Sequence, residues 1–342
     1  MRIALYTDVH FSEFSSIIRS MGEHYSTRLE NLIKSVNWAE KLADDYNCDE
    51  IFCLGDFFDK PELNSAELTA LKEIKWSSKP HRFLVGNHEG SVRSLKYNST
   101  WALEGRGFDI ISEPKYIELD NCVLVFIPYI LEADRKPLKE YIPDTKKDVY
   151  VFSHNDIAGI QYGAIESKEG FKVDEIRQYC DLFLNGHLHN GGEFADFRGS
   201  NIGNLTGQNF NEDALKYIHP VFILNTDSGA IETYENPYAF NFYQFEVYKE
   251  KDLEKLDEIK PYSILQIKYA ESIKDKLDLK LTALNSRIVA SRLLIVRDSD
   301  IVDDSALQQI QAVNHLKQFC DFSIEALGNS QILQNELAKI LA

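Results

Sequence analysis

The sequence LNGHLH at residues 184–189 ends an apolar run that begins at Cys180. Side chains two positions apart in a β-strand point the same way, so His187 and His189 can converge on one place or on two neighbouring places. Two imidazoles at the end of an apolar strand indicate a metal site. The alternative is that backbone groups and water satisfy both rings. The side chains that follow other apolar runs distinguish these interpretations.

Four other apolar runs end in the same kinds of side chain. Each reads as a buried strand, and each is followed by aspartate, asparagine or histidine. Over the first 90 residues the runs alternate with helical patterns, which predicts a sheet with helices on its faces and a ligand site beyond the strand carboxyl ends. Five such ends are hard to explain as solvated turns. The residues they deliver, besides the two histidines above, are Asp8 and His10, Asp56, Asn87 with His88, and His154.

The succession of elements predicts an α/β fold in which two β-sheets pack face to face between outer helices. A helix is expected from Thr27 to about Ala43, with Thr27 and Glu30 forming a capping box. A second helix is expected from Asn64 to about Trp76, and a short one at 174–179. Strands are expected at residues 3–6, 50–54, 82–85, 116–119, 123–127, 149–153, 180–184, 193–197, 200–202 and 221–225, within a first domain that spans residues 1–236.

The predicted ligands are imidazoles, carboxylates and one amide, without thiolates. This mixture suits manganese, iron or zinc better than calcium or a structural zinc, and magnesium remains an alternative. Seven ligands are too many for one such ion. Two divalent ions that share a carboxylate, about 3.5–4 Å apart, use seven ligands and leave open positions for water and a phosphoryl oxygen. We therefore expect a two-metal site, with manganese as the expected ion.

The ordered blocks Asp8-x-His10, Gly55-Asp56, residues 86–89 (GNHE), His154 and residues 186–189 (GHLH) resemble the signature of calcineurin-type metallophosphoesterases. By this resemblance one metal would be held by Asp8, His10, Asp56 and His189. The second would be held by Asp56, Asn87, His154 and His187, with Asp56 bridging the two. His88 would be the catalytic acid near the leaving group, a role that suits an imidazole near neutral pH.

Residues 1 to about 230 are also similar to the SbcD-type nucleases, the bacterial and phage branch of the Mre-eleven family. Further matches are residues 126–129 (FIPY) and the segment 202–227. The resemblance implies a DNA exonuclease and endonuclease that acts in repair and recombination with a Rad-fifty-like or SbcC-like ATPase. Asp59 departs from it, because many members have a second histidine there. The alternative is a stand-alone phosphatase or cyclic-nucleotide phosphodiesterase, although the arginine typical of protein phosphatases is missing from residues 57–61.

The remaining chain predicts two further units. Residues 237–298 read as a small α+β domain, with strands near 243–248, 262–267 and 288–296 and a helix between the last two. It is either a stabilising appendage or, by resemblance, a cap that holds duplex DNA over the metals. Residues 299–342 read as an acidic linker and two amphipathic helices that begin after Ser305 and Ser330. These helices either pack on their own domain or, by resemblance, bind the ATPase coiled coil.

Composition sets the remaining expectations. The formal net charge of −17 argues against a broad nucleic-acid-coating surface, but not against a local basic groove or a metal-lined pocket. The five cysteines lack CxxC spacing and are interpreted as reduced core residues. The longest apolar stretch, residues 123–131, is too short to cross a membrane and contains Pro128. We expect a cytoplasmic protein of a bacterial or phage-infected cell, either monomeric or a homodimer.

Overall fold

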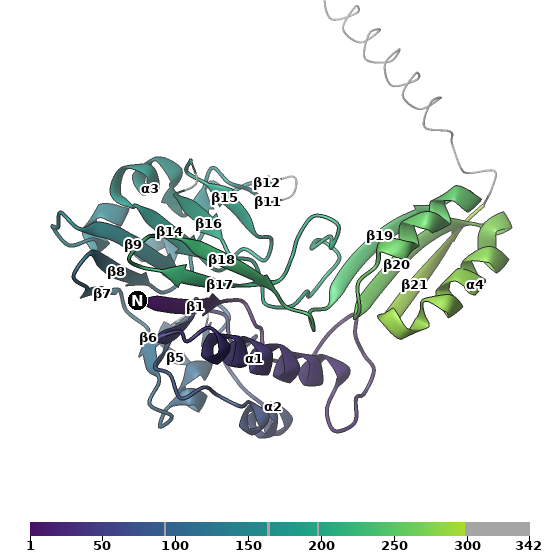
Figure 1. The fold of residues 1–342 in the computed structure, drawn as a ribbon, viewed down its shortest axis with the longest axis horizontal. Helices are drawn as coiled ribbons and strands as arrows, with labels where there is room; N and C mark the ends of the chain where they lie inside the picture. The colour runs from purple at the N-terminus through teal and green to yellow at the C-terminus, as the bar shows by residue number, and fades with distance from the viewer. Residues whose placement is uncertain (92–93, 163–164, 197, 298–342) are drawn as a thin grey trace, which may run out of the picture.

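A computed structural model describes residues 1–91, 94–162, 165–196 and 198–297 of the chain (Figure 1). The two helices expected in residues 299–342, with Cys320, lie outside these residues. The other four cysteines are buried and free. Among the described helices, none is both long and apolar enough to span a membrane.

The first sheet has six strands: β1 Arg2–Tyr6, β2 Glu50–Cys53, β3 His81–Leu84, β6 Asp109–Ile111, β17 Pro220–Asn225 and β18 Ile231–Glu235. They lie in the order β18-β17-β1-β2-β3-β6. The last four run parallel, and β17 and β18 extend the sheet antiparallel beyond β1. The carboxyl ends of β1, β2 and β3 therefore meet at one edge. The sequence pattern missed β6 and β18, of which β6 is short and β18 is largely exposed.

The second sheet also has six strands: β7 Lys115–Glu118, β8 Cys122–Ile127, β9 Asp148–Ser153, β14 Leu182–Asn185, β15 Gly192–Phe194 and β16 Gly199–Asn201. Their order is β15-β16-β14-β9-β8-β7, with β8, β9, β14 and β16 parallel. Six further strands form three two-stranded sheets, namely β4 Gly90–Ser91 with β5 Ser94–Asn98, β10 Ile157–Ala158 with β13 Phe171–Lys172, and β11 Gln161–Tyr162 with β12 Ile165–Glu166.

A shared core joins the two sheets. Along β1, Ile3 and Leu5 point into this core, whereas Ala4 and Tyr6 belong to the core on the opposite face. Full burial of each large apolar side chain in this core stabilises the folded state by roughly 1.5–3 kcal/mol. The centre of the shared core is a triangle of rings 5.1–5.4 Å apart, made by Phe52, Phe126 and Phe152.

Helices cover the outer faces of both sheets. Helices α1 (Thr27–Asp45) and α2 (Ser65–Ala70) lie on the first sheet, and α3 (Val173–Tyr179) lies on the second (Figure 1). The predicted fold of two packed sheets flanked by helices is confirmed.

Two helix boundaries differ from the prediction. Helix α1 is capped by Ser26, whose side chain accepts from the backbone N–H of Leu29. Glu30 does not form the expected box, because its carboxylate accepts from the backbone of His24 instead. Helix α2 has the capping box expected at Asn64 and Glu67 but ends well before Trp76. The chain turns extended at Ile74, whose side chain is buried in the core beneath α1.

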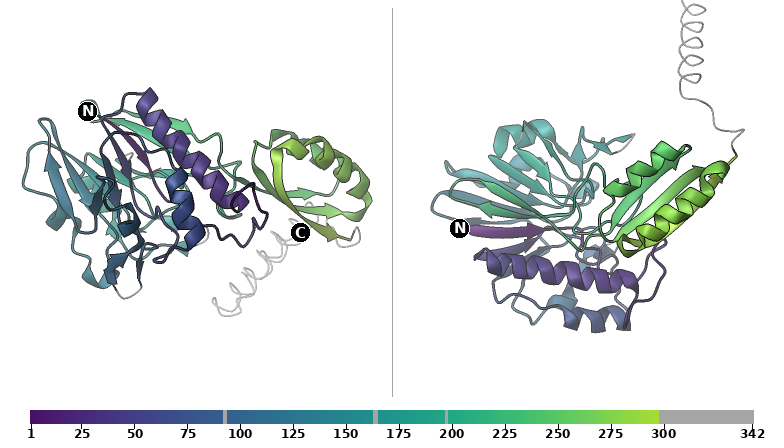
Figure 2. Two further views of the ribbon diagram at one scale, coloured as in Figure 1. Left: turned by 90° about the horizontal axis from the view of Figure 1, so that it is seen from below. Right: turned by 45° about the vertical axis from the view of Figure 1, so that its right-hand side comes forward.

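Residues 241–296 form a third sheet with a core of its own (Figure 2). Its parallel strands are β19 Asn241–Val247, β20 Ser263–Ala270 and β21 Ile288–Val296, and one face is covered by α4 Lys274–Ala283 and a 3-10 segment at Glu250–Glu258. Leu277 of α4 is fully buried there. Ile273, Leu281 and Leu284 are partly buried against the same core.

Candidate metal centre

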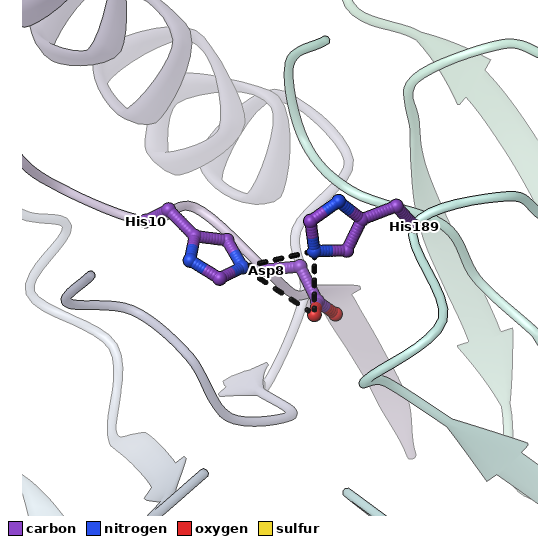
Figure 3. A group of neighbouring side chains, drawn as sticks. All are labelled: Asp8, His10 and His189. Carbon is purple, nitrogen blue, oxygen red and sulfur yellow. Dashed lines mark hydrogen bonds and ion pairs between the residues drawn. The ribbon is translucent and has the colours of Figure 1, made fainter. Parts of the chain in front are cut away.

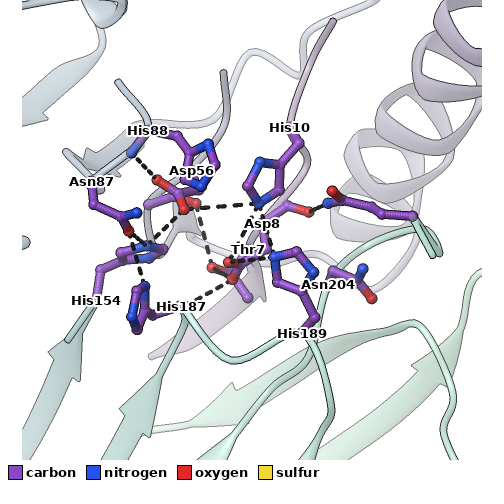
Figure 4. A network of polar contacts seen from close by, with 12 residues as sticks. Thr7, Asp8, His10, Asp56, Asn87, His88, His154, His187, His189 and Asn204 are labelled. Carbon is purple, nitrogen blue, oxygen red and sulfur yellow. Dashed lines mark hydrogen bonds and ion pairs between the residues drawn. The ribbon is translucent and has the colours of Figure 1, made fainter. Parts of the chain in front are cut away.

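All seven predicted ligands lie on loops that directly follow strands. Asp8 and His10 follow β1, Asp56 follows β2, and Asn87 follows β3. From the second sheet, His154 follows β9 and the pair His187 and His189 follows β14. Because the two sheets are stacked, these strand ends meet, and the structure brings the seven side chains together (Figure 4).

The loops hold several of these residues in an unusual backbone conformation. Asp8, His10, Asp56 and His187 have φ values of 50°, 47°, 48° and 69°. A non-glycine residue in this region costs of order 1–3 kcal/mol and persists only where its surroundings impose it. Here hydrogen bonds between the loops impose it: the backbone N–H of His10 donates to the Asp56 carbonyl at 2.9 Å, and that of His187 donates to Asp8 Oδ2 at 3.0 Å.

Two glycines of the sequence motifs are explained by close approach. Gly55 has φ +98°, and a Cβ at this position would collide with the ring of His154. A Cβ at Gly86 would collide with the carboxylate of Asp56. The glycine that precedes a ligand thus lets the loops from different strands come within ligand distance of one another.

The first ligand cluster contains Asp8, His10 and His189 (Figure 3). Asp8 Oδ1 lies 3.8 Å from the Nε2 atoms of both histidines, which are 3.1 Å from each other. Asp56 Oδ2 lies 3.8 Å from His10 Nε2, so this oxygen is a fourth candidate metal ligand for the first cluster.

The second cluster contains Asp56, Asn87, His154 and His187. Asp56 Oδ2 lies 3.1 Å from His154 Nε2. Asn87 Oδ1 lies 3.3 Å from His154 Nε2 and 2.9 Å from His187 Nδ1. The same oxygen of Asp56 therefore faces a histidine of each cluster, as expected for a bridging carboxylate.

Each of the four clustered histidines has its other ring nitrogen fixed by an acceptor. An oxygen that can only accept requires a proton on the facing nitrogen, which leaves the lone pair of the remaining nitrogen directed into the cluster. We infer the four tautomers from these partners. The pairs are His10 Nδ1 with Asp59 Oδ1 (2.9 Å), His154 Nδ1 with the Leu54 carbonyl (2.6 Å), His187 Nε2 with Asp156 Oδ1 (3.2 Å) and His189 Nδ1 with Glu212 Oε1 (3.0 Å).

Sequence reasoning missed the supporting carboxylates. Asp156 follows no motif, Glu212 lies in the segment 202–227 that is similar to the nucleases but carries no predicted role there, and Asp59 stands out only as a departure from the nuclease pattern. Glu89 is fully buried and accepts from the backbone N–H groups of Asp56 at 3.1 Å and Gly86 at 2.6 Å, so it ties two ligand loops together. Its position directly after His88 was the available signal. Burial and the charge of Asp56 raise the pKa of Glu89 to about 8.

Charges within the centre are strongly coupled. Burial by itself lowers the pKa of His10, but hydrogen bonds to Asp59 and Asp8 and the nearby carboxylates outweigh it and raise the pKa to about 10. Burial likewise lowers the pKa of His154, but the charge of Asp56 outweighs burial and raises this pKa to about 9. Burial raises the pKa of Asp56, but the imidazoles of His154 and His10 hold it well below its usual range. The carboxylates thus attract positive charge into this centre, and a bound cation would take the place of the second proton on these imidazoles.

The residues present fit divalent cations. Asp8 Oδ1 is buried and has no hydrogen-bond partner, although an unpaired buried carboxylate oxygen is costly. It faces two imidazole nitrogens whose lone pairs converge on the same place. Imidazole, carboxylate and amide donors without thiolate suit intermediate divalent metals.

His88 lies beside the clusters with its side chain 43% exposed. Its backbone N–H donates to Asp56 Oδ1 at 2.9 Å, and its Nδ1 lies 3.0 Å from the Asp59 carbonyl oxygen. A carbonyl only accepts, so Nδ1 carries a proton and Nε2 is the nitrogen that can exchange one. His88 also lies within ligand distance of His10 and Asp56, which makes a ligand role the alternative.

Two packed sheets with a cluster of histidine and carboxylate side chains at their strand ends form a site of the kind that binds divalent metals. The model of the calcineurin-like phosphoesterase family matches residues 1–191, more than half of the chain. The protein therefore belongs to the calcineurin-like phosphoesterases.

Two solved structures are similar to this chain at low identity. TT1561 of Thermus thermophilus is 11% identical, with 68% of this chain and 98% of that chain covered and a TM-score of 0.42. A metallophosphoesterase from Sphaerobacter thermophilus is 13% identical, with 69% and 89% covered and a TM-score of 0.32. Among curated proteins none matches this chain.

Proposed function

We propose that this phosphoesterase is a two-metal, manganese-dependent DNA nuclease, the subunit of an SbcC/SbcD-like complex that hydrolyses phosphodiester bonds in repair and recombination. One ion would be held by Asp8, His10, Asp56 and His189, and the other by Asp56, Asn87, His154 and His187. Bound divalent ions supply a nucleophilic water at neutral pH and compensate charge on the phosphoryl oxygens.

The observation that carries the proposal is the third sheet, which lies beside the edge where β1 ends (Figure 2). It is joined to that edge by hydrogen bonds, among them Gln244 Nε2 to the Phe210 carbonyl at 2.8 Å. Its face opposite α4 carries hydrogen-bonding side chains in register, Gln244 beside Gln266 and Gln266 beside Arg292. Amide and guanidinium groups of this kind contact nucleic-acid backbones. A long substrate that reaches beyond the metal centre would use this surface.

The ligand loops favour a diester over a monoester. A phosphate monoester carries two negative charges and is commonly bound by an extra cationic side chain beside the metals. A phosphate diester carries one negative charge and needs no such side chain. Lys60 is the first cation after Asp56 in the chain, and its ammonium is paired with the buried Glu67 at 2.9 Å. Arg28 donates to the backbone carbonyl of His10 at 3.1 Å. Both cations are thus engaged in holding the loops.

The chain's own residues also supply the proton transfer. The Asp59 carbonyl holds the Nδ1 proton of His88, so a protonated Nε2 can donate to the leaving oxygen as the phosphodiester bond breaks. Asp59, Asp156 and Glu212 keep the histidines in the tautomers that expose a lone pair to the cations.

The test is a comparison of substrates with purified protein. End-labelled duplex and single-stranded DNA are expected to be cleaved with manganese and to stay intact with a chelator. Bis-p-nitrophenyl phosphate should be hydrolysed faster than the p-nitrophenyl monoester. Faster turnover of the monoester or of a cyclic nucleotide, with DNA intact, would instead support the stand-alone phosphatase or phosphodiesterase.

The ATPase partner is proposed to bind residues 299–342, which lie outside the described structure. Deleting residues 300–342 is expected to preserve folding and metal-dependent cleavage of short DNA but to abolish binding to the ATPase coiled coil. Two short amphipathic helices are marginal alone and gain roughly 1.5–3 kcal/mol for each apolar side chain that a partner buries. Calorimetric melting and a pull-down on the ATPase check this. A destabilised truncation that still binds would contradict it.

A further inference from the structure

Glu212 lies between the metal centre and the third sheet, downstream of the segment that the family model matches. Its side chain is buried and accepts four hydrogen bonds. Oε1 accepts from His189 Nδ1 at 3.0 Å and Asn209 Nδ2 at 2.9 Å, and Oε2 accepts from Asn204 Nδ2 at 2.9 Å and the backbone N–H of Gln208 at 2.7 Å. A carboxylate has room for about four such bonds. The acceptor that holds His189 is therefore itself fixed.

The contact with Glu212 determines what His189 offers to the first cluster. With its proton on Nδ1, the ring directs the Nε2 lone pair toward Asp8 Oδ1 at 3.8 Å, beside His10 Nε2 at 3.1 Å. The His189 side chain is 27% exposed, so little packing holds it in place on the solvent side. Its orientation thus depends strongly on this hydrogen bond.

The residues around Glu212 are also fastened to β19. Asp213 pairs with Phe242 as an isolated bridge, and the backbone N–H of Ala214 donates to the Phe242 carbonyl at 2.9 Å. The rings of Phe210 and Phe242 meet edge to face at 5.2 Å, and Gln244 donates to the Phe210 carbonyl. Ala214 is buried in the core of the third sheet. Glu212 therefore contacts His189, and the next two residues of the chain, Asp213 and Ala214, contact β19.

The second cluster is supported from elsewhere. The acceptor for His154 is the carbonyl of Leu54, which follows β2, and the acceptor for His187 is Asp156, two residues after His154. Both belong to loops of the two main sheets. Through Glu212, the third sheet is connected to the first cluster rather than to the second.

We propose that Glu212 is a positioning residue that couples the third sheet to cation binding at Asp8, His10 and His189. A ligand that shifts the third sheet changes cation affinity at this cluster, and cation binding there restrains β19. The coupling has the same size in both directions, because it is a free energy between two binding events. It requires the metal centre but no particular substrate.

Manganese titration calorimetry tests the positioning role. Glu212→Ala is expected to weaken one binding event about 10–100-fold, the usual effect of losing a partner of a metal-bound histidine, and to leave the other unchanged. Asp156→Ala is the matched variant and should weaken the other event. Glu212→Gln retains an amide oxygen that can accept from His189 and should lose less. Unchanged affinity in a natively folded Glu212→Ala protein would refute the role.

Hydrogen exchange tests the coupling. Manganese is expected to slow exchange of the amides in residues 241–247 of the wild type, and this effect should disappear in Glu212→Ala. Gln244→Ala, which removes the hydrogen bond from the third sheet to the Phe210 carbonyl, should reduce it. Lys268→Ala, which removes an exposed ion pair with Glu246 on the same sheet, should behave like the wild type. If manganese leaves β19 exchange unchanged in the wild type, or protects β19 in Gln244→Ala and Glu212→Ala as strongly as in the wild type, the coupling is wrong. Absence of DNA cleavage would refute the proposed substrate without altering these results.

Discussion

Replacing Asp56 with alanine is expected to reduce hydrolysis to background and to remove high-affinity binding of both cations. The physical reason is that Asp56 Oδ2 faces His10 of one cluster and His154 of the other. Its removal takes away the one negative charge that the two clusters share and leaves both imidazoles without that partner. Calorimetric titration with manganese and a nuclease assay measure the two effects.

Two variants make the Asp56 result specific. Asp174→Ala removes a carboxylate whose side chain is 90% exposed, and it should change neither affinity nor activity. Asp56→Asn keeps an oxygen that can accept from the His88 backbone but loses the charge, so it should bind the cations more weakly than the wild type. Retention of two tightly bound ions by Asp56→Ala would show that this residue does not bridge.

Replacing His88 with alanine is expected to slow DNA cleavage about 10²–10⁴-fold, the range for loss of a general acid, while manganese affinity stays unchanged. The half-exposed ring has one nitrogen fixed by the Asp59 carbonyl and the other able to exchange a proton. Single-turnover cleavage rates and manganese titration measure the two quantities separately.

A ligand role for His88 predicts a different pattern. Weaker manganese binding in His88→Ala would place this ring in the cation shell with His10 and Asp56. A substrate with a more acidic leaving group needs less protonation, so it should be cleaved by His88→Ala with a smaller deficit if the ring is the acid. His24→Ala, which alters an exposed histidine outside the centre, is the control.

The seven clustered side chains could be predicted from the sequence because each one follows a pattern that is visible in the neighbouring residues. An apolar strand comes first, and a glycine allows close approach where Gly55 and Gly86 precede ligands. Parallel strands then bring residues distant in the chain, such as Asp8 after β1 and Asn87 after β3, to the same edge of a sheet. The face-to-face packing of the sheets follows from the same apolar runs.

Other features depend on tertiary contacts that leave no local trace. Glu212 supports His189 from the segment 202–227, where no ligand pattern marks it, and Asp156 is an ordinary aspartate until the fold brings it to His187. The capping box predicted at Thr27 does not form because the backbone N–H groups of His24 and Tyr25 donate to the Glu30 carboxylate instead. Helix propensity could not foresee that Ile74 is buried, which ends α2 early.

The distribution of ligands between the sheets affects more than catalysis. The first sheet supplies Asp8, His10, Asp56 and Asn87, and the second supplies His154, His187 and His189. Each cluster draws on both sheets, so a bound cation would act as a removable cross-link across the sandwich. Such a cross-link forms only when both sheets are folded, and its binding free energy adds to the stability of the folded state. Metal supply would then control how readily the two sheets separate.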